Sequence, residues 1–380
     1  MPRPNILLVG PHRHLQPREP GLLDLLPVRP RGGDLPRGAP RRGLPDGRPR
    51  QVAPGDLRGL AAPQHGRLVD LPGPGRLRRS RDDRPRGGGD GPGLRDGQVT
   101  SRSIDFLDRR DPERPFCLLV HHKAPHRPWI PDPRYEGRYT EGTIPEPETI
   151  ADDHAGRSAS VRRVAMRLDD LTLTDVKEPV PPELEGEERC AERSSWKYQR
   201  YMRDHLRCVQ AVEDSVGELL DYLDEHDLAE NTLVIYTSGQ GFLLGDHGWF
   251  DKRPMFDESF TMPFVVRWPD GIPAGTRVEE MVTNVDVAAT LLEAAGISPT
   301  ALPEQQGRSF LPLLRGERVE DWPEAGYYRY WEHDDPEHHA PAYYGVRTRT
   351  HTYVHYYNDG PGTPGVAPLT CPCEGSTIAA

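Results

Sequence analysis

The chain has 380 residues and a net charge of −11 at neutral pH, and a chain of this length suggests two domains. Its five cysteines are odd in number and include no Cys-x-x-Cys pair, so neither a disulfide framework nor a zinc site is indicated. No charged segment followed by an apolar one opens the chain, and no long apolar run occurs. Secretion and membrane spanning are therefore not indicated, and we expect a cytoplasmic protein without a membrane partner.

The charge is divided unevenly along the chain. Residues 1–100 contain 19 Arg and no Lys against 10 acidic residues, whereas residues 101–380 contain 29 basic and 49 acidic residues. Residues 11–100 alone hold 18 Arg, 15 Pro and 17 Gly, and they include no aromatic residue, Ile or Met. Such a segment cannot bury enough apolar surface to offset the entropy of ordering, so we expect it to be disordered.

Three interpretations of this Arg/Pro/Gly-rich segment are open. Its composition is that of GC-rich codons read in a shifted frame, and ordinary protein sequence flanks it abruptly, so we prefer frame-shifted translation. A natural disordered linker is the second interpretation. A basic RNA-binding arm is the third, but Lys and aromatic residues are missing and acidic residues are interspersed. We therefore expect no nucleic-acid partner.

The remaining sequence alternates apolar runs with one-sided helical patterns. Apolar residues recur at helical spacing over roughly 197–226, and Thr283 with Asn284 can cap a second helix over 285–295 that ends at Gly296. Buried strands are predicted from the apolar runs at 4–9, 116–120, 233–236 and 263–268. Strands that alternate with helices predict an α/β fold with a mostly parallel central sheet and flanking helices, here incomplete.

Other regions complete the predicted architecture. Residues 131–195 are rich in Pro and charge, which suggests a long surface insertion. Residues 344–348 and 352–356 could pair as a short C-terminal antiparallel hairpin. We therefore divide the chain into a first strand at 1–10, the Arg/Pro/Gly-rich segment at 11–100, an α/β domain at 101–325, a remnant of a C-terminal subdomain at 326–357 and a disordered tail at 358–380.

Two polar loops follow predicted strands, and sites in open α/β sheets lie at the carboxyl ends of strands. Residues 121–129 follow one strand, and residues 237–253 follow another. Both loops are rich in cationic side chains and poor in well-placed carboxylates. This set suits the binding of an ester that carries negative charge, because cations stabilise that charge.

The two loops resemble the site segments of the sulfatases, in the alkaline phosphatase superfamily. There the second loop commonly reads Thr-Ser-Asp-Gln/His-Gly, then Gly-Glu/Asp-His-Gly, with a Lys thirteen residues after the Asp. Here residues 237–241 read Thr-Ser-Gly-Gln-Gly, residues 245–248 read Gly-Asp-His-Gly, and Lys252 keeps the spacing. Residues 123–126 read Lys-Ala-Pro-His, as in the family's first segment. The resemblance covers residues 4–9 and roughly 101–357.

This resemblance implies a sulfuric ester hydrolase that acts on a sulfated sugar or aryl ester and uses Ca²⁺. It implies that His126 and Lys252 are catalytic residues that contact the sulfate, that Lys123 and His247 bind substrate, and that Gln240 is a metal ligand. His247 could instead brace the loop. The implied partner is a small-molecule or glycan sulfate ester.

The chain departs from the family pattern at the metal site and at the nucleophile. Gly239 occupies the usual Asp ligand position, and Gly10-Pro11-His12 follows the first strand where an Asp pair is usual. The family nucleophile, a Cys or Ser in Cys/Ser-x-Pro-x-Arg that is oxidised to formylglycine, is not found. We therefore expect weak Ca²⁺ binding and little or no hydrolysis. The alternatives are a phosphodiesterase or phosphonate hydrolase of the same superfamily and a non-catalytic sulfatase remnant.

Overall fold

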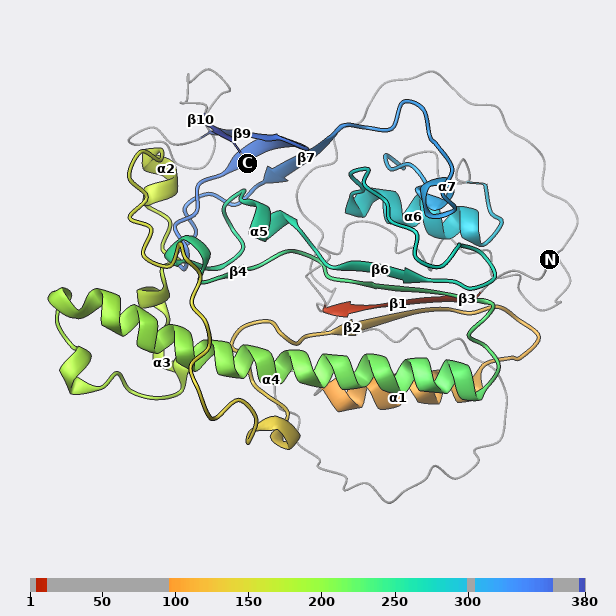
Figure 1. Cartoon of the computed structure of the whole chain (residues 1–380), viewed down its shortest axis with the longest axis horizontal. Coiled ribbons are helices and arrows are strands. Elements are labelled where there is room, and N and C mark those ends of the chain that lie inside the picture. Colours follow the sequence, from red (N-terminus) through yellow and green to blue (C-terminus); the bar gives the residue numbers. More distant parts are fainter. Residues whose placement is uncertain (1–4, 12–95, 299–304, 358–375, 380) are drawn as a thin grey trace, which may run out of the picture. The chain divides into compact units, whose positions relative to one another are not determined.

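Short apolar strands form a central four-stranded sheet (Figure 1). The computed structural model describes residues 5–11, 96–298, 305–357 and 376–379, all within one compact unit of the chain. The strands of this sheet lie in the order β2 (Cys117–His122), β1 (Asn5–Pro11), β3 (Thr232–Thr237) and β6 (Phe264–Arg267). β1 is parallel to β2 and β3, and β6 is antiparallel to β3, so the predicted mostly parallel sheet is confirmed.

The parallel register places the two predicted loops at one edge of the sheet. Gly10 of β1 pairs with His121 of β2, and Val9 pairs with Tyr236 of β3. Glycine is needed at position 10, because a Cβ atom there would lie 1.6 Å from the carbonyl oxygen of Thr237. The chain segments that leave β2 and β3 therefore start at the same edge of the sheet, on either side of β1.

Two helices cover one face of this sheet (Figure 1). They are α1 (Asp96–Arg109) and α4 (Cys190–Glu225). Their apolar side chains meet those of the strands in one core cluster, because each element has one apolar side to bury. Its members include Leu107, Leu219 and Leu223 from the helices and Leu7, Val9, Leu118, Val120 and Val234 from the strands.

α4 begins well before the predicted start at residue 197. Its first turns lack an apolar repeat, and tertiary contacts hold them instead. Arg193 Nε lies 2.6 Å from Asp169 Oδ1, and Lys197 Nζ lies 3.4 Å from the same oxygen. A helix start fixed by a partner distant in sequence has no local pattern from which to predict it.

The predicted helix near residue 285 is confirmed as α6 (Asn284–Ala294). Thr283 caps it, donating from both its backbone N–H and its Oγ1 to Asp286 Oδ2 at 2.8 Å. Gly296 follows with φ of +67°, as expected for the residue after the cap. Phe310, before α7 (Leu311–Leu314), packs edge-on against Phe264 of β6.

The predicted C-terminal hairpin is confirmed, within a larger antiparallel sheet. Its order is β10 (Ser376–Ala379), β9 (His351–Tyr356), β8 (Tyr343–Thr348) and β7 (Ala325–Tyr330). β8 and β9 are the predicted pair, and β7 had no predicted partner. β10 falls inside the tail at 358–380, for which the expected disorder stays a prediction.

The Arg/Pro/Gly-rich segment overlaps the described residues only at its ends. Pro11 belongs to β1, and α1 starts at Asp96, so the predicted boundary at residue 100 is too late. Residues 12–95 and 358–375 lie outside the described residues, and the disorder expected there stays a prediction. No described helix is long and apolar enough to cross a membrane. The cytoplasmic location also stays a prediction.

The region between β2 and α4 is not the surface insertion that the sequence suggested. It contributes buried side chains to a second core cluster, among them Val161, Met166, Leu168, Leu171 and Val176. Its helices are too short for an apolar repeat to show in the sequence. They are η2 (Pro133–Tyr135), α2 (Ala159–Arg162), η3 (Leu168–Asp170), α3 (Leu173–Val176), η4 (Pro182–Leu184) and η5 (Glu187–Arg189).

Candidate functional site

A cavity of about 340 Å³ lies where the loops after β2 and β3 meet α4. His126 comes from the first loop, and Gly239, Gln240 and Lys252 come from the second. The sequence therefore predicted correctly that these two loops meet. The other lining residues are Pro125, His205, Val209, Val212, Tyr236, Ser238, Gly241, Phe242, Leu244, Glu258, Thr261 and Pro263.

Lys252 is the principal cation of the cavity. It follows β5 (Phe250–Asp251), which pairs with β4 (Leu243–Leu244) as a two-stranded ribbon. The residue is 6% exposed, and Nζ lies 5.4 Å from the centre of the Phe242 ring. Because little water surrounds it, this ammonium group attracts an anion in the cavity more strongly than a surface lysine would.

Asp251 holds Lys252 in place. Its Oδ1 lies 3.3 Å from Lys252 Nζ and 3.5 Å from Arg253, and its Oδ2 lies 3.3 Å from His338 Nε2. Burial alone would raise the pKa of Asp251, but His338, Lys252 and Arg253 outweigh burial and hold it well below the usual range. The carboxylate is therefore ionised and acts as a buried counter-charge for Lys252 and Arg253, with His338 as a third partner.

His338 connects this cluster to the segment between β7 and β8. Its Nδ1 lies 2.8 Å from Asp335 Oδ1. Burial alone would lower the pKa of His338, but Asp251 and Asp335 outweigh that effect and raise it. Tyr343 of β8 adds a second connection, because its Oη donates to the Arg253 carbonyl at 2.7 Å. Both contacts fix the loop that carries Lys252 against the C-terminal sheet.

His126 is oriented by the backbone next to it. Its Nδ1 lies 2.8 Å from the Arg127 carbonyl oxygen, which can only accept, so Nδ1 carries a proton. Burial lowers the pKa of His126, and the positive charge of Lys252 lowers it further. The neighbouring Arg127 is anchored by Asp175, with Nε to Oδ1 at 2.6 Å. At neutral pH, His126 is therefore a neutral, fixed ring.

The opposite side of the cavity is poor in ligands for a metal ion. Gly239 is exposed and has no side chain, and Gln240 Nε2 donates to the Ser259 carbonyl at 2.6 Å. Glu258, in α5 (Asp257–Phe260), is the one carboxylate among the described lining residues. No group of three His, Cys, Asp or Glu residues suited to a metal ion occurs in the described part of the chain. These donors do not fit Ca²⁺, which prefers several carboxylates.

Two predicted substrate-binding residues do not line this cavity. Lys123 is exposed at the start of the first loop. His247 lies in η6 (Asp246–Gly248), where its Nδ1 is 3.0 Å from Asp152 and its backbone N–H donates to Thr149. These contacts match the alternative in which His247 braces the loop. Substrate roles for Lys123 and His247 stay predictions.

His205 is a lining residue that the sequence did not single out. It is 7% exposed, and burial lowers its pKa to about 4. It lies on α4 at helical spacing from Val209 and Val212, which also line the cavity. A histidine inside an otherwise apolar stripe was the available signal, since such a stripe normally faces a core.

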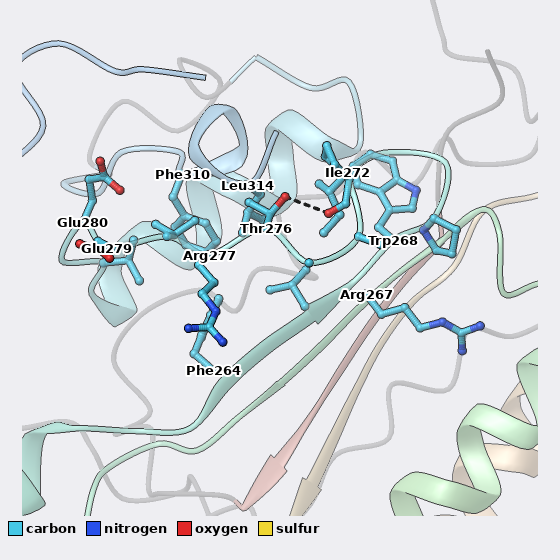
Figure 2. Close-up of a pocket in the computed structure, with 17 residues that line it drawn as sticks. Phe264, Arg267, Trp268, Ile272, Thr276, Arg277, Glu279, Glu280, Phe310 and Leu314 are labelled. Carbon is cyan, nitrogen blue, oxygen red and sulfur yellow. Dashed lines mark hydrogen bonds between the residues drawn. The ribbon is translucent and has the colours of Figure 1, made fainter. Parts of the chain in front are cut away.

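A larger cavity of about 890 Å³ lies beside β6 (Figure 2). Figure 2 shows apolar side chains such as Phe264, Phe310 and Leu314 around it, together with Arg277. It shares no lining residue with the first cavity. Of the predicted site residues, His126, Gln240 and Lys252 line the smaller cavity, and none lines the larger one.

Family comparisons cover most of the described chain. The sulfatase family model matches residues 68–297, and the model for the C-terminal part of N-sulphoglucosamine sulphohydrolase matches residues 245–362. The first match starts inside the Arg/Pro/Gly-rich segment. The second covers Lys252 together with β7, β8 and β9 of the C-terminal sheet.

Individual relatives are sulfatases of sugars and of aryl esters. An N-acetylglucosamine-6-O-sulfatase of Bacteroides thetaiotaomicron is 37% identical over 300 residues, which are 69% of this chain and 53% of the relative. An arylsulfatase of Clostridium perfringens is 28% identical over 228 residues, or 59% of this chain and 42% of the relative. The chain thus spans about half the length of the curated relatives it matches.

A solved structure in complex with its substrate, D-glucosamine-2-N,6-O-disulfate, is 34% identical with a TM-score of 0.66. The similarity covers 76% of this chain and 63% of that one. A phosphonate monoester hydrolase from Silicibacter pomeroyi is 18% identical with a TM-score of 0.52, and covers 69% of this chain and 53% of that one. At that identity the likeness concerns the fold alone.

Proposed function

Because this chain belongs to the sulfatase family, we propose that its smaller cavity binds the sulfate group of a sulfated glucosamine. The observation that carries the proposal is the pair of His126 and Lys252, from two loops distant in sequence, lining one cavity of about 340 Å³. The relatives named for N-acetylglucosamine 6-sulfate and the solved complex with a disulfated glucosamine support the choice of sugar.

Each side chain has a distinct part in the proposed binding. Lys252 supplies a fixed positive charge, because Asp251 holds its ammonium group at the cavity wall. His126 supplies its Nε2 atom, which accepts a hydrogen bond from a sugar hydroxyl when neutral and donates to a sulfate oxygen when protonated. The Phe242 ring, also at the wall, offers apolar contact to the sugar.

We also propose that the chain releases little or no sulfate. The sequence contains no Cys/Ser-x-Pro-x-Arg, so the nucleophile expected of the family is missing. Gly239 and Gln240 supply no carboxylate where the family places one, and the donors at the cavity do not fit Ca²⁺. The proposed activity is therefore binding of the ester without efficient cleavage.

The proposed cause of both losses is frame-shifted translation within residues 11–100. If so, another reading frame of these codons encodes a carboxylate-bearing strand end and a Cys/Ser-x-Pro-x-Arg motif. Translation of the gene in the two other frames tests this directly. If neither frame is open across the segment, the segment is a natural part of the chain.

Calorimetric titration with glucosamine 6-sulfate tests the binding proposal. We expect Lys252→Ala and His126→Ala each to weaken binding about tenfold or more, which corresponds to ~1.4 kcal/mol. Arg318→Ala, which removes an exposed cation outside the cavity, is the matched control and should bind as the wild type does. Equal affinity in all four proteins would reject the cavity as the sulfate site, and tighter binding of glucosamine 6-phosphate would favour the phosphate-ester alternative.

A further inference from the structure

The C-terminal sheet has two faces of different character. Side chains alternate between the faces along each strand. In β7, Tyr328 and Tyr330 point to the second core cluster, and the buried Tyr343, Val354 and Tyr356 of β8 and β9 join them there. The opposite face carries the other set of residues and lies away from that core.

On this opposite face, aromatic and cationic side chains gather into what we name the outer platform. Strand register places Arg329 beside Tyr344, and Tyr344 beside His355. Tyr327 and Trp331 stand at alternate positions to either side of Arg329, and Tyr357 continues the β9 row. The outer platform therefore consists of Tyr327, Arg329, Trp331, Tyr344, His355 and Tyr357.

Direct contacts make the outer platform a continuous surface. The Arg329 guanidinium lies 3.7 Å from the centre of the Trp331 ring and 5.2 Å from that of Tyr357. The Tyr344 ring lies 4.9 Å from His355 and 6.1 Å from Tyr357, each with a tilted geometry. These contacts restrict side-chain rotation, so less conformational entropy is lost when a ligand binds.

The outer platform is open to solvent. Trp331 is 72% exposed and Tyr327 is 64% exposed, whereas Trp129 and Trp249 are fully buried. Arg329 Nε donates to Tyr357 Oη at 3.2 Å, and no carboxylate of the described residues forms an ion pair with Arg329. An exposed aromatic group with a cation that lacks a counter-charge is typical of a recognition surface for an anion.

We propose that the outer platform binds a sulfated oligosaccharide chain, as a second glycan site on the face opposite the core. Aromatic rings suit the apolar C–H face of a sugar ring, and arginine suits the oxygens of a sulfate group. Five of the six outer-platform residues can donate hydrogen bonds from Arg, His or Tyr, which suits the many oxygen acceptors of a sulfated glycan. The choice of a sulfated glycan over a neutral one rests on the proposed function.

The test uses the full chain and a size-defined heparin octasaccharide, which contains sulfated glucosamine, with its fully desulfated form for comparison. Arg329→Gln with Trp331→Ala should weaken octasaccharide binding about tenfold or more, with an unchanged melting temperature. The matched control is Arg349→Gln with Tyr139→Ala, an exposed arginine and an exposed tyrosine outside the outer platform. The control should bind as the wild type does.

Different results would contradict the proposed sulfate site in the cavity and the proposed glycan site on the outer platform. Lys252→Ala should lose glucosamine 6-sulfate binding at the cavity and keep octasaccharide binding at the outer platform. Unchanged octasaccharide affinity in the Arg329/Trp331 variant would overturn the inference, as would equal binding of the desulfated chain. A wild-type dimer that this variant converts to monomer, measured by light scattering without any change in glycan affinity, would instead identify the face as a self-association surface.

Discussion

The two sides of the candidate site differ in how completely they are built. On one side, Lys252 and His126 are each fixed by a partner, the Asp251 carboxylate and the Arg127 carbonyl. On the other side, Gly239 has no side chain at the position where the resemblance leads us to expect an Asp. The positive charges and the metal ligands are therefore independent parts of this site. The positive charges can remain in a stable loop even where the metal ligands are absent.

The structural reason is that the cationic side also stabilises the fold. Asp251 is 5% exposed and is shared by Lys252, Arg253 and His338, so losing it would leave buried charges unpaired. Gly239 has no comparable partner to lose. The stability of the fold therefore depends on the Asp251 cluster on the cationic side, and it does not depend in the same way on residue 239 on the metal side.

The largest effect should follow removal of the shared counter-charge. Asp251→Asn leaves cationic groups buried without a partner and should lower the free energy of unfolding by about 3–5 kcal/mol. Urea denaturation measures it. Asp257→Asn is the control, because Asp257 is half exposed and pairs with Arg347 at 2.7 Å, so the loss should stay below about 1 kcal/mol. Similar losses in both variants would remove the structural distinction between the two sides.

Gly239→Asp should restore part of the metal-binding side of the site. It adds a carboxylate beside Gln240, so calcium affinity should rise about tenfold, measured by titration. Gly137→Asp, at a site where a Cβ atom meets nothing within 4 Å, controls for added charge alone. Sulfate release should stay absent, because the nucleophile is still missing. If calcium affinity does not change, the metal side lacks more than one ligand.

Substitution of His247 distinguishes a role in bracing the loop from a role in substrate binding. If it braces the loop through Asp152, His247→Ala should lower stability by about 1 kcal/mol and leave the affinity for glucosamine 6-sulfate unchanged. His339→Ala, which removes an exposed histidine, is the control. A loss of affinity at constant stability would instead assign His247 to the substrate.

The smallest effect concerns the pH dependence of binding. The pKa of His126 lies below its ordinary value because of burial and Lys252, so the ring is neutral at pH 7. A bound sulfate favours the protonated ring, so affinity should rise a few-fold, on the order of threefold, as the pH falls through the pKa. Above pH 7, the affinity should not change with pH. Titrations at several pH values measure it, and His126→Asn should abolish the slope.

The sequence predicted what depends on local pattern and failed where distant contacts decide. The strand at Thr232–Thr237 and the cap at Thr283 follow from apolar runs and capping residues, and both are present. The start of α4 depends on Asp169, and the fixing of Lys252 depends on His338, which is far along the chain. No pattern of residue spacing in the sequence predicts contacts between residues so far apart in the chain. The loops that carry His126 and Lys252 meet because they follow β2 and β3, the two parallel strands that flank β1.

We propose that the chain binds a sulfate ester and does not cleave it. The most direct measurement follows glucosamine 6-sulfate with excess protein, recording bound ligand by titration and released sulfate by ion chromatography in the same sample. We expect saturable binding that Lys252→Ala weakens, with no sulfate released above the protein-free control. Release of sulfate above the protein-free control would contradict binding without cleavage and would require a nucleophile elsewhere in the chain.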